Sequence, residues 1–356
     1  MGNCSSEELS LSELELYTPQ LSQYKLLYVI GKGGFGRVWK VKCQKKFFAL
    51  KEMIKSKIIE KQSIQSVMNE RILLQKLNHP FLVNMRGAFQ TSTHLYIVLD
   101  YMEGGDLRYH LCKQGKFTEE QTKFFVICIL MALQYLHKNL VLHRDIKPEN
   151  LVFDDEGYLH ITDLGIARIW KPNNKNETSG TPGYMAPEVM MKSDHGVACD
   201  YFALGCLVYE CLTGKRPYQG KNRRQIRELI LSKQVKLHKQ GLSKEVSDFV
   251  NKLLERKPIQ RLGNDGPDEV MGHPWLKNVD WARHYDKLIE APYKIVGKDN
   301  FDSKFVNQVL TISEYKDERD RNNMFQGFTY FENNDEQQVT DIDTNKQKLL
   351  LSTKYY

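Results

Sequence analysis

The stretch HRDIKPEN, residues His143 to Asn150, decides the fold, because it stands between two short β-like runs, VLH and NLVF. A further run ends in ITDLG and places Asp163 directly after a strand. Carboxylate and amide oxygens of this kind bind Mg²⁺ or accept a proton. Each residue alone is typical of a loop turn, but the whole set in this order predicts a site. In it Asp145 accepts the proton of a substrate hydroxyl, and Asn150 and Asp163 hold a metal ion.

Toward the N-terminus, the stretch GKGGFGRV carries Gly31, Gly33 and Gly36 between two strand-like runs. Glycines let the backbone approach phosphate oxygens and present N–H groups to them. The spacing G-x-G-x-x-G is weak alone, and before a helix it would indicate a dinucleotide site. Here RVWKVK continues as a strand, so the pattern predicts a hairpin that covers phosphates.

A lysine and a glutamate between these two stretches form the next predicted contact. Val67, Glu70, Leu74 and Leu77 fall on one stripe of a helix, which places Glu70 in an apolar face. A carboxylate buried without a partner costs several kcal/mol, so Glu70 needs a cation. Lys51, on the preceding strand FFALKEM, is the nearest candidate. The alternative for Lys51, an ordinary edge-strand lysine, leaves Glu70 unpaired.

The pattern along the chain changes once, near residues 100–105. Short β-like runs dominate residues 24–99, with one helical segment at about 62–77. Residues 107–276 are helical in pattern apart from short strands, and residues after 277 are mostly polar. The order predicts an α+β protein of two lobes with a tail.

These motifs, together with MAPE ending at Glu188, resemble the signature set of eukaryotic protein kinases, with DLG where DFG is usual. The resemblance covers residues 24–276 and implies a catalytic domain with a small β-rich N-lobe and a larger α-helical C-lobe. It also implies ATP and Mg²⁺ as cofactors. Lys147 and GTPGYMAPE with Thr181 resemble the Ser/Thr kinases, so transfer of the ATP γ-phosphate to protein Ser/Thr is expected.

Carried over by position, the resemblance assigns catalysis to Asp145 and Lys147 and metal binding to Asn150 and Asp163. The residues that it assigns to ATP binding are Gly31, Lys32, Gly33, Gly34, Phe35, Gly36, Val38, Ala49, Lys51, Glu70, Asp100, Met102, Leu151 and Phe301. It further implies that Glu188 pairs with Arg261, that Asp200 braces the catalytic loop, and that Leu99 is the gatekeeper.

The tail, residues 277–356, resembles that of the AGC group of kinases. EAPY at Glu290–Tyr293, NFD at Asn300–Asp302 and the hydrophobic motif FQGFTY carry the resemblance. It implies that Phe325 and Phe328 dock on the small lobe and that Thr329 is phosphorylated, which would make the tail an activity switch. The alternative is an apolar tail fragment without a docking role.

The activation loop departs from the group. Arg144 and Arg168 resemble a pocket for a loop phosphate, but Glu177 stands where the group has its phosphothreonine, and Thr178 lies one place late. A carboxylate carries about one negative charge and a phosphate about 1.5 to 2. Two hypotheses remain: Glu177 partly substitutes for the phosphate, or Thr178 is the site in a shifted register.

Three carboxylates match positions that receive arginines in relatives selective for basic substrates. They are Asp106, Glu149 and Glu210, and they predict protein substrates with basic residues before the acceptor. The alternative is that Asp106 and Glu149 serve the ribose or the structure only.

The composition is that of a globular protein. Of the 356 residues 41% are hydrophobic and 27% charged, which excludes collagen-like, disordered and coiled-coil classes. The net charge of +7 suits nucleotide phosphates and is weak support for nucleic acid, which we do not expect as a partner. The seven cysteines are scattered without a C-x-x-C pair, so they predict no disulfide scaffold or structural zinc site. We expect a monomer.

The first residues, MGNCSS, match an acylation signal. Gly2 fits N-myristoylation and Cys4 palmitoylation, and two acyl chains give a stable anchor where one gives a marginal one. Residues 1–23 are therefore expected to be an acylated leader that holds the chain at the cytoplasmic face of membranes, with a cytosolic fraction. The alternative is a polar start without a lipid.

The rival function is a pseudokinase scaffold that binds nucleotide without transferring phosphate. A scaffold has no chemical reason to keep Lys51, Glu70, Asp145, Asn150 and Asp163 together. The sequence therefore favours the enzyme.

Overall fold

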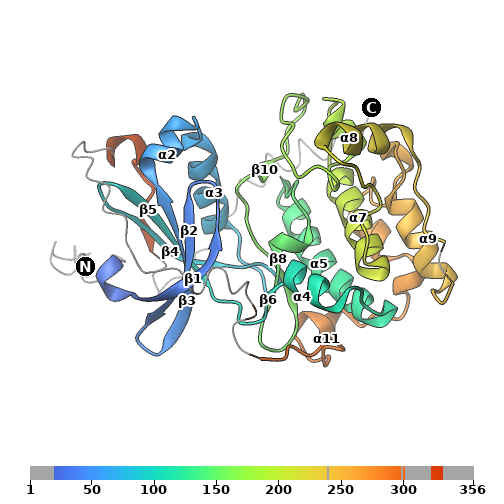
Figure 1. The fold of residues 1–356 in the computed structure, drawn as a ribbon, viewed down its shortest axis with the longest axis horizontal. Coiled ribbons are helices and arrows are strands. Elements are labelled where there is room, and N and C mark those ends of the chain that lie inside the picture. Colours follow the sequence, from blue (N-terminus) through green and yellow to red (C-terminus); the bar gives the residue numbers. More distant parts are fainter. Residues whose placement is uncertain (1–19, 239, 298–299, 301–321, 332–356) are drawn as a thin grey trace, which may run out of the picture.

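The small lobe is built on an antiparallel sheet, shown at the left of Figure 1. The computed structural model describes residues 20–238, 240–297, 300 and 322–331. Within these residues the sheet has six strands in the order β1-β2-β3-β5-β4-β11. The strands are β1 (Lys25–Lys32), β2 (Gly36–Cys43), β3 (Lys46–Ile54), β4 (Met85–Gln90), β5 (His94–Asp100) and β11 (Tyr330–Phe331).

Two helices follow β3, where the sequence predicted one. They are α2 (Lys55–Glu60) and α3 (Ile64–Lys76). The helix predicted at about 62–77 is present as α3, shorter by two residues at its start and one at its end, whereas α2 was not predicted. Gln62 adopts a left-handed backbone conformation with φ of 52°, which ends one helix before the next begins. Leu77 is extended and closes α3 one residue early.

The last strand comes from the tail. β11 pairs antiparallel with β4, with Tyr330 opposite Ala88 and Phe331 opposite Gly87. The short helix η5 (Asn322–Phe325) precedes it. Phe325 and Phe328 are fully buried in the core beside α3. The tail therefore supplies the last strand at one edge of the small-lobe sheet. Without it, β4 would be an edge strand with unpaired backbone N–H and C=O groups.

The large lobe packs helices around α5 and α7, which are buried along most of their length. The remaining helices lie around them (Figure 1). The α-helices are α4 (Leu107–Gln114), α5 (Glu119–Lys138), α6 (Pro187–Met190), α7 (Ala198–Thr213), α8 (Arg223–Ser232), α9 (Lys244–Leu253), α10 (Pro267–Met271) and α11 (Trp281–Tyr285). In the part of the chain that the structure describes, no helix combines the length and apolarity that crossing a bilayer requires.

Short strands at the base of the lobe position the catalytic loop. They are β6 (Gly105–Asp106), β7 (Val141–Leu142), β8 (Leu151–Phe153), β9 (Leu159–Ile161) and β10 (Arg168–Ile169). β8 and β9 pair with each other, and β10 pairs with β7. The sequence predicted β7, β8 and β9 from their apolar runs but not β6 and β10, whose residues Gly105–Asp106 and Arg168–Ile169 form no apolar run.

The first part of the tail is more ordered than its polarity suggested. After α11, the Ile289 carbonyl accepts a hydrogen bond from the Tyr158 hydroxyl. Tyr293 packs edge-on against Phe117 and His110 of the large lobe. Aromatic residues spaced singly in a polar segment therefore hold it to the helices.

Candidate active site

The phosphate-loop glycines serve two different purposes. The hairpin between β1 and β2 closes with a hydrogen bond from the Gly33 amide to the Gly36 carbonyl at 3.0 Å. A Cβ on Gly36 would lie 1.9 Å from the Glu52 carbonyl oxygen, so this glycine is required by packing against β3. A Cβ on Gly33 would meet nothing within 4 Å, which leaves its backbone open to a ligand.

A lysine holds this hairpin from the neighbouring helix. Lys61, which follows α2, donates to the Gly34 carbonyl at 2.8 Å and lies over the Phe35 ring at 5.4 Å. Gly34 and Phe35 were predicted to contact ATP, whereas Lys61 was not predicted at all. Its only sequence signal is its place at the end of a helix that was itself missed.

Lys51 joins the two lobes of the site. Its Nζ lies 2.6 Å from Glu70 Oε1 and 3.5 Å from Asp163 Oδ1. The predicted Lys51–Glu70 pair is therefore present. Burial alone would lower the pKa of Lys51, but the two carboxylates outweigh burial and raise it above its ordinary value. The same lysine is the main cause that lowers the pKa of Asp163. Lys51 is thus positively charged and directed at the site.

Asp145 is surrounded by donors. Its Oδ2 accepts from Lys147 Nζ at 2.6 Å and from Asn150 Nδ2 at 3.0 Å. Its Oδ1 accepts from the Thr181 hydroxyl at 2.7 Å and the Thr181 amide at 3.1 Å. A side-chain hydroxyl therefore already donates to Asp145 in the geometry that a base needs toward an acceptor hydroxyl.

The loop that carries Asp145 is fixed by a buried carboxylate. Asp200, on α7, accepts from the amides of His143 at 3.0 Å and Arg144 at 2.7 Å and from His137 Nε2 at 2.9 Å. Burial raises the pKa of Asp200, but these donors together lower it below its usual value. Arg144 is held at a φ of 66°, a strained conformation for a non-glycine residue. The predicted bracing by Asp200 is present.

Asn150 and Asp163 fit a metal ion by their free oxygens. Both side-chain hydrogen bonds recorded for Asn150 use Nδ2, which leaves the amide oxygen to ligate. The Asp163 side chain is 48% exposed. Among the described residues no three His, Cys, Asp and Glu side chains converge as a ligand set. This pair therefore fits Mg²⁺, which is usually held by one or two protein oxygens together with substrate phosphates.

Several of the residues predicted to bind ATP are apolar and lie close to the junction of the lobes. Ala49 pairs with Leu99 across β3 and β5, and both are buried, as is Leu151 at the start of β8. Val38, opposite Lys51 on β2, and Met102 are half-buried. The described structure thus gathers these predicted contacts at the junction of the lobes.

Other predicted nucleotide contacts are placed differently. Lys32 lies opposite Arg37 at the hairpin end and is exposed. The Asp100 carboxylate binds Arg86 at 2.7 and 3.0 Å, and its amide donates to the Asn84 carbonyl at 3.0 Å. Phe301 lies outside the described residues, as do Gly2 and Cys4.

Arg144 and Arg168 do not share one anion. Arg144 Nη1 lies 3.2 Å from Glu177 Oε2 and donates to the Glu177 carbonyl at 2.9 Å. Arg168 instead donates to the Ala167 carbonyl at 2.7 Å and to Ser66 Oγ at 3.4 Å. Of the two arginines, the structure places Arg144 against Glu177, and their joint pocket for a loop phosphate stays a prediction. Arg168 follows the DLG turn toward α3, a direction that sequence spacing does not give.

The tail motif contacts the helix that carries Glu70. Arg71, next to Glu70 on α3, donates to the carbonyls of Phe328 at 2.9 Å and Thr329 at 3.1 Å. Lys55 lies over the Phe325 ring at 5.4 Å. The Thr329 side chain is exposed. Docking of both predicted phenylalanines is present, and Arg71, which the sequence did not single out, links Phe328 to α3.

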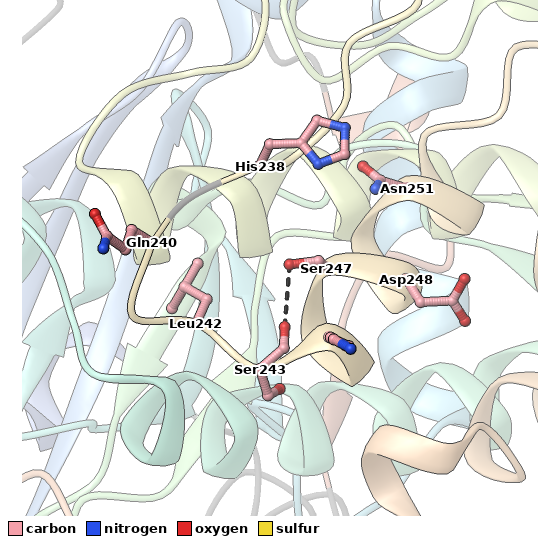
Figure 2. A pocket seen from close by; sticks show the side chains of 8 residues that line it. His238, Gln240, Leu242, Ser243, Ser247, Asp248 and Asn251 are labelled. Atoms are coloured by element: carbon pink, nitrogen blue, oxygen red, sulfur yellow. Dashed lines mark hydrogen bonds between the residues drawn. The ribbon is translucent and has the colours of Figure 1, made fainter.

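The pocket in Figure 2 lies elsewhere. It is formed in the large lobe by α9 and the segment before it. Its lining residues are His238, Gln240, Leu242, Ser243, Lys244, Ser247, Asp248 and Asn251. None of the residues predicted for catalysis or nucleotide binding lines it. Since none of those residues reaches it, we assign it no part in the chemistry.

The family and the relatives to which this chain is similar are all described as kinases. Residues 24–276 match the family described as "Protein kinase domain". "Protein kinase 2" of Dictyostelium discoideum is 38% identical over 320 residues, 86% of this chain and 67% of that protein. "Ribosomal protein S6 kinase alpha-2" of Homo sapiens is 36% identical over 340 residues, 91% of this chain and 46% of that protein.

A third relative covers a larger share. The "RAC family serine/threonine-protein kinase homolog" of Dictyostelium discoideum is 35% identical over 324 residues, 87% of this chain and 72% of that protein. The chain thus spans between 46% and 72% of the length of these three relatives.

Proposed function

The chain belongs to the protein kinase family, and from that premise we propose that it is a serine/threonine protein kinase. The observation that carries the proposal is the Thr181 hydroxyl donating to Asp145, beside the Lys51–Glu70–Asp163 cluster. A hydroxyl acceptor and a phosphate donor therefore have prepared positions in one site. The proposed cofactors are ATP and Mg²⁺, as in the family.

Each residue has a separate part in the proposed mechanism. ATP with Mg²⁺ supplies the phosphoryl group and neutralises the charge that develops in transfer. Lys51, oriented by Glu70, binds the nonreacting phosphates, and Asn150 and Asp163 would hold the metal. Asp145 accepts the proton of the acceptor hydroxyl. In the structure the same carboxylate accepts a hydrogen bond from the Thr181 hydroxyl. Lys147, hydrogen bonded to both Asp145 and Thr181, keeps a positive charge beside the transferring group.

The test is phosphorylation of a positional-scanning Ser/Thr peptide library by purified full-length protein with Mg²⁺ and ATP. Asp145→Asn removes the base and should abolish incorporation. Asp155→Asn, the same chemical change at an exposed turn, is the matched control and should leave incorporation unchanged. Full activity of Asp145→Asn would refute the assignment. ATP binding by wild type without any transfer would establish the scaffold instead.

The substrates proposed for this kinase are proteins, and the predicted preference for basic residues before the acceptor would require carboxylates beside the acceptor position that a substrate arginine can reach. Two of the three predicted carboxylates support this by position. Glu149 lies in the short helix η2 (Pro148–Asn150), directly after Lys147, and Glu210 lies on α7 beside Tyr184. Asp106 instead caps α4, where its carboxylate accepts from the Tyr109 amide at 2.8 Å. The preference would therefore rest on Glu149 and Glu210.

The second part of the proposal is attachment to the cytoplasmic face of membranes through Gly2 and Cys4, with a cytosolic fraction. Its support is the pattern MGNCSS alone. The test is metabolic labelling of cells with a clickable myristate analogue. Wild type should be labelled and should sediment with membranes, whereas Gly2→Ala should lose both properties. Cys4→Ser should keep the label and shift the protein to the cytosol, because one acyl chain binds only marginally. An unlabelled wild type would refute the anchor.

A further inference from the structure

The two carboxylates proposed to receive basic substrate residues are already bound by an arginine of the chain itself. Arg108, on α4, donates Nε to Glu149 at 2.9 Å and Nη1 to Glu210 at 2.9 Å. Its Nη2 donates to the Tyr184 hydroxyl at 2.7 Å and to the second Glu210 oxygen at 3.3 Å. All three guanidinium nitrogens are therefore engaged, and Glu210 is held in the two-pronged geometry that arginine makes with carboxylates.

The Glu210 end of this cluster is withdrawn from solvent, whereas the Glu149 side chain is 42% exposed. The Glu210 side chain is 5% exposed and also accepts a hydrogen bond from the Tyr184 hydroxyl. Burial alone would lower the pKa of Arg108, but its contacts with Glu210, Tyr184 and Glu149 raise it instead. A carboxylate this buried requires a cation, and removing the cation strands the charge. Arg108 thus supplies the cation that the buried Glu210 carboxylate requires.

A second cation completes the balance of charge. Arg216 Nε lies 3.6 Å from Glu210 Oε1, and its guanidinium lies 5.7 Å from the centre of the Tyr184 ring. Two carboxylates, Glu149 and Glu210, therefore face two guanidinium groups. An arginine arriving with a substrate would have to displace Arg108 from Glu210 and would gain no additional ion pair by doing so.

The cluster lies next to the acceptor position. Glu149 follows Asp145 by four residues in the catalytic loop, and Tyr184 follows Thr181 by three. Thr181 is the residue whose hydroxyl donates to Asp145. A peptide that presents its hydroxyl to Asp145 would pass beside Arg108, so the state of this cluster affects the residues flanking the acceptor.

We propose that Arg108 occupies the subsite of a basic substrate residue and masks the preference that Glu149 and Glu210 would otherwise confer. Peptides with neutral residues before the acceptor are then phosphorylated about as well as peptides with arginine there. The inference rests on the proposed kinase activity and defines its substrate class: acceptor sites that need no preceding arginine.

The experiment compares two peptides that differ only at the second and third residues before a single serine, which are arginines in one and alanines in the other. The readout is the ratio of kcat/KM for the basic peptide to that for the neutral one. Wild type should give a ratio within about threefold of unity. Arg108→Ala uncovers two carboxylates and should raise the ratio by about tenfold or more, because charged hydrogen bonds are the strong ones. The effect should disappear in Arg108→Ala combined with Glu149→Gln and Glu210→Gln.

The matched control is Lys113→Ala, which removes an exposed positive charge from the same helix and should leave the ratio unchanged. Arg108→Gln replaces the alanine variant if thermal unfolding shows that the latter is not folded. A wild-type ratio above about 30, or an unchanged ratio in folded Arg108 variants, would overturn the inference. Wild type that phosphorylates neither peptide would refute the kinase proposal instead. In that case the ratio of the two peptides' Kd values, measured by fluorescence anisotropy on the same variants, decides the inference.

Discussion

Two ion-pair clusters of this molecule, Arg261–Glu188 and Lys51–Glu70–Asp163, are built from the same kinds of charged group but differ in their exposure to solvent. In the large lobe, Arg261 pairs through two nitrogens with Glu188 at 2.6 and 2.9 Å and also donates to the carbonyls of Ala198 and Glu255. The Arg261 and Glu188 side chains are 0% and 4% exposed. Between the lobes, Lys51 binds Glu70, but its side chain is 22% exposed, and Asp163 is half in solvent.

The difference is in how completely the charges are satisfied. Every hydrogen bond of the Arg261–Glu188 pair stays inside the protein, so the pair can only hold structure. The Lys51 cluster retains exposed charge of both signs at the place where phosphate and metal would bind. A buried pair that is fully satisfied supports the fold, whereas a pair left partly open is available for chemistry.

The largest effect should come from removing the charge of the open cluster. Lys51→Met should lower kcat/KM for peptide phosphorylation by roughly 10³–10⁵-fold, the magnitude known for cationic stabilisation of phosphoryl transfer. The free energy of unfolding should fall by less than the loss in kcat/KM corresponds to. The reason is that Glu70, whose pKa burial already raises, can take up a proton when Lys51 is absent. Initial-rate kinetics and urea unfolding measure the two effects. Lys46→Met, at an exposed position of β3, is the control. Retained activity in Lys51→Met would remove the distinction between the clusters.

The closed cluster should show the reverse pattern. Arg261→Met strands Glu188 and the carbonyls of Ala198, Glu255 and Arg256, so the free energy of unfolding should fall by about 3–5 kcal/mol. Equilibrium urea denaturation measures this loss, and Arg223→Met, at an exposed position of α8, should be nearly neutral. The double variant with Glu188→Met should recover part of the loss. A loss below about 1 kcal/mol in Arg261→Met would show that burial of this pair does not make it structural.

A smaller effect should follow from protonating His79, a buried histidine whose hydrogen bond with a backbone amide requires the neutral ring. His79 Nδ1 accepts a hydrogen bond from the Phe81 amide at 3.1 Å, and its ring stacks on Tyr135. Burial, with a contribution from His160, lowers the pKa of His79 from 6.5 to about 4. The unfolded chain therefore binds this proton more readily, so the stability that neutral His79 supports is present above about pH 6.5 and declines as pH falls toward 4.

Between pH 7 and pH 5 this histidine should account for about 2 kcal/mol of lost stability. His79→Gln keeps an acceptor for the amide and cannot titrate. Its unfolding free energy, measured by urea at both pH values, should therefore fall less on acidification than that of wild type by this amount. Equal pH dependence in the two proteins would contradict the prediction.

The smallest effect concerns the partly exposed Arg144–Glu177 pair, which is intermediate between the two clusters. Glu177→Gln should reduce kcat/KM by about 3–10-fold, because a half-open ion pair contributes about 1 kcal/mol. Phosphatase treatment should leave wild-type activity unchanged if Glu177 substitutes for a phosphate. If treatment abolishes activity and Thr178→Ala reproduces the loss, Thr178 is the regulatory site and the Glu177 hypothesis is wrong.

The sequence predicted the α+β fold of two lobes correctly because its signals are local. Strand alternation and helical spacing were sufficient to pair Lys51 with Glu70 across 19 residues. The order of Asp145, Asn150 and Asp163 around short strands was enough to bring them to one site. In each case a short element fixes the direction of the side chain, so that spacing carries geometric information.

What the sequence did not give depends on packing between distant elements. Arg108 meets Glu210 across 102 residues, and Arg71 meets Phe328 across 257. The sequence did contain one signal for Arg108. This arginine lies two residues after Asp106, the first of the three predicted carboxylates, at the start of the helix that Asp106 caps. The contact of Arg168 with Ser66 had no signal in the sequence. It depends on the backbone direction of the activation loop after the DLG turn, which residue spacing does not determine.

The strand β11 also has a consequence in time. Its residues enter the sheet beside β4, and Arg71 reaches a carbonyl 258 positions further along the chain. At ribosomal rates of roughly 5–20 residues per second, the small lobe emerges tens of seconds before the segment that completes it. During synthesis the nascent chain therefore carries a sheet with an open edge and a helix α3 without its tail contacts. The complete set of contacts around Glu70 therefore forms only after residue 331 has been synthesised.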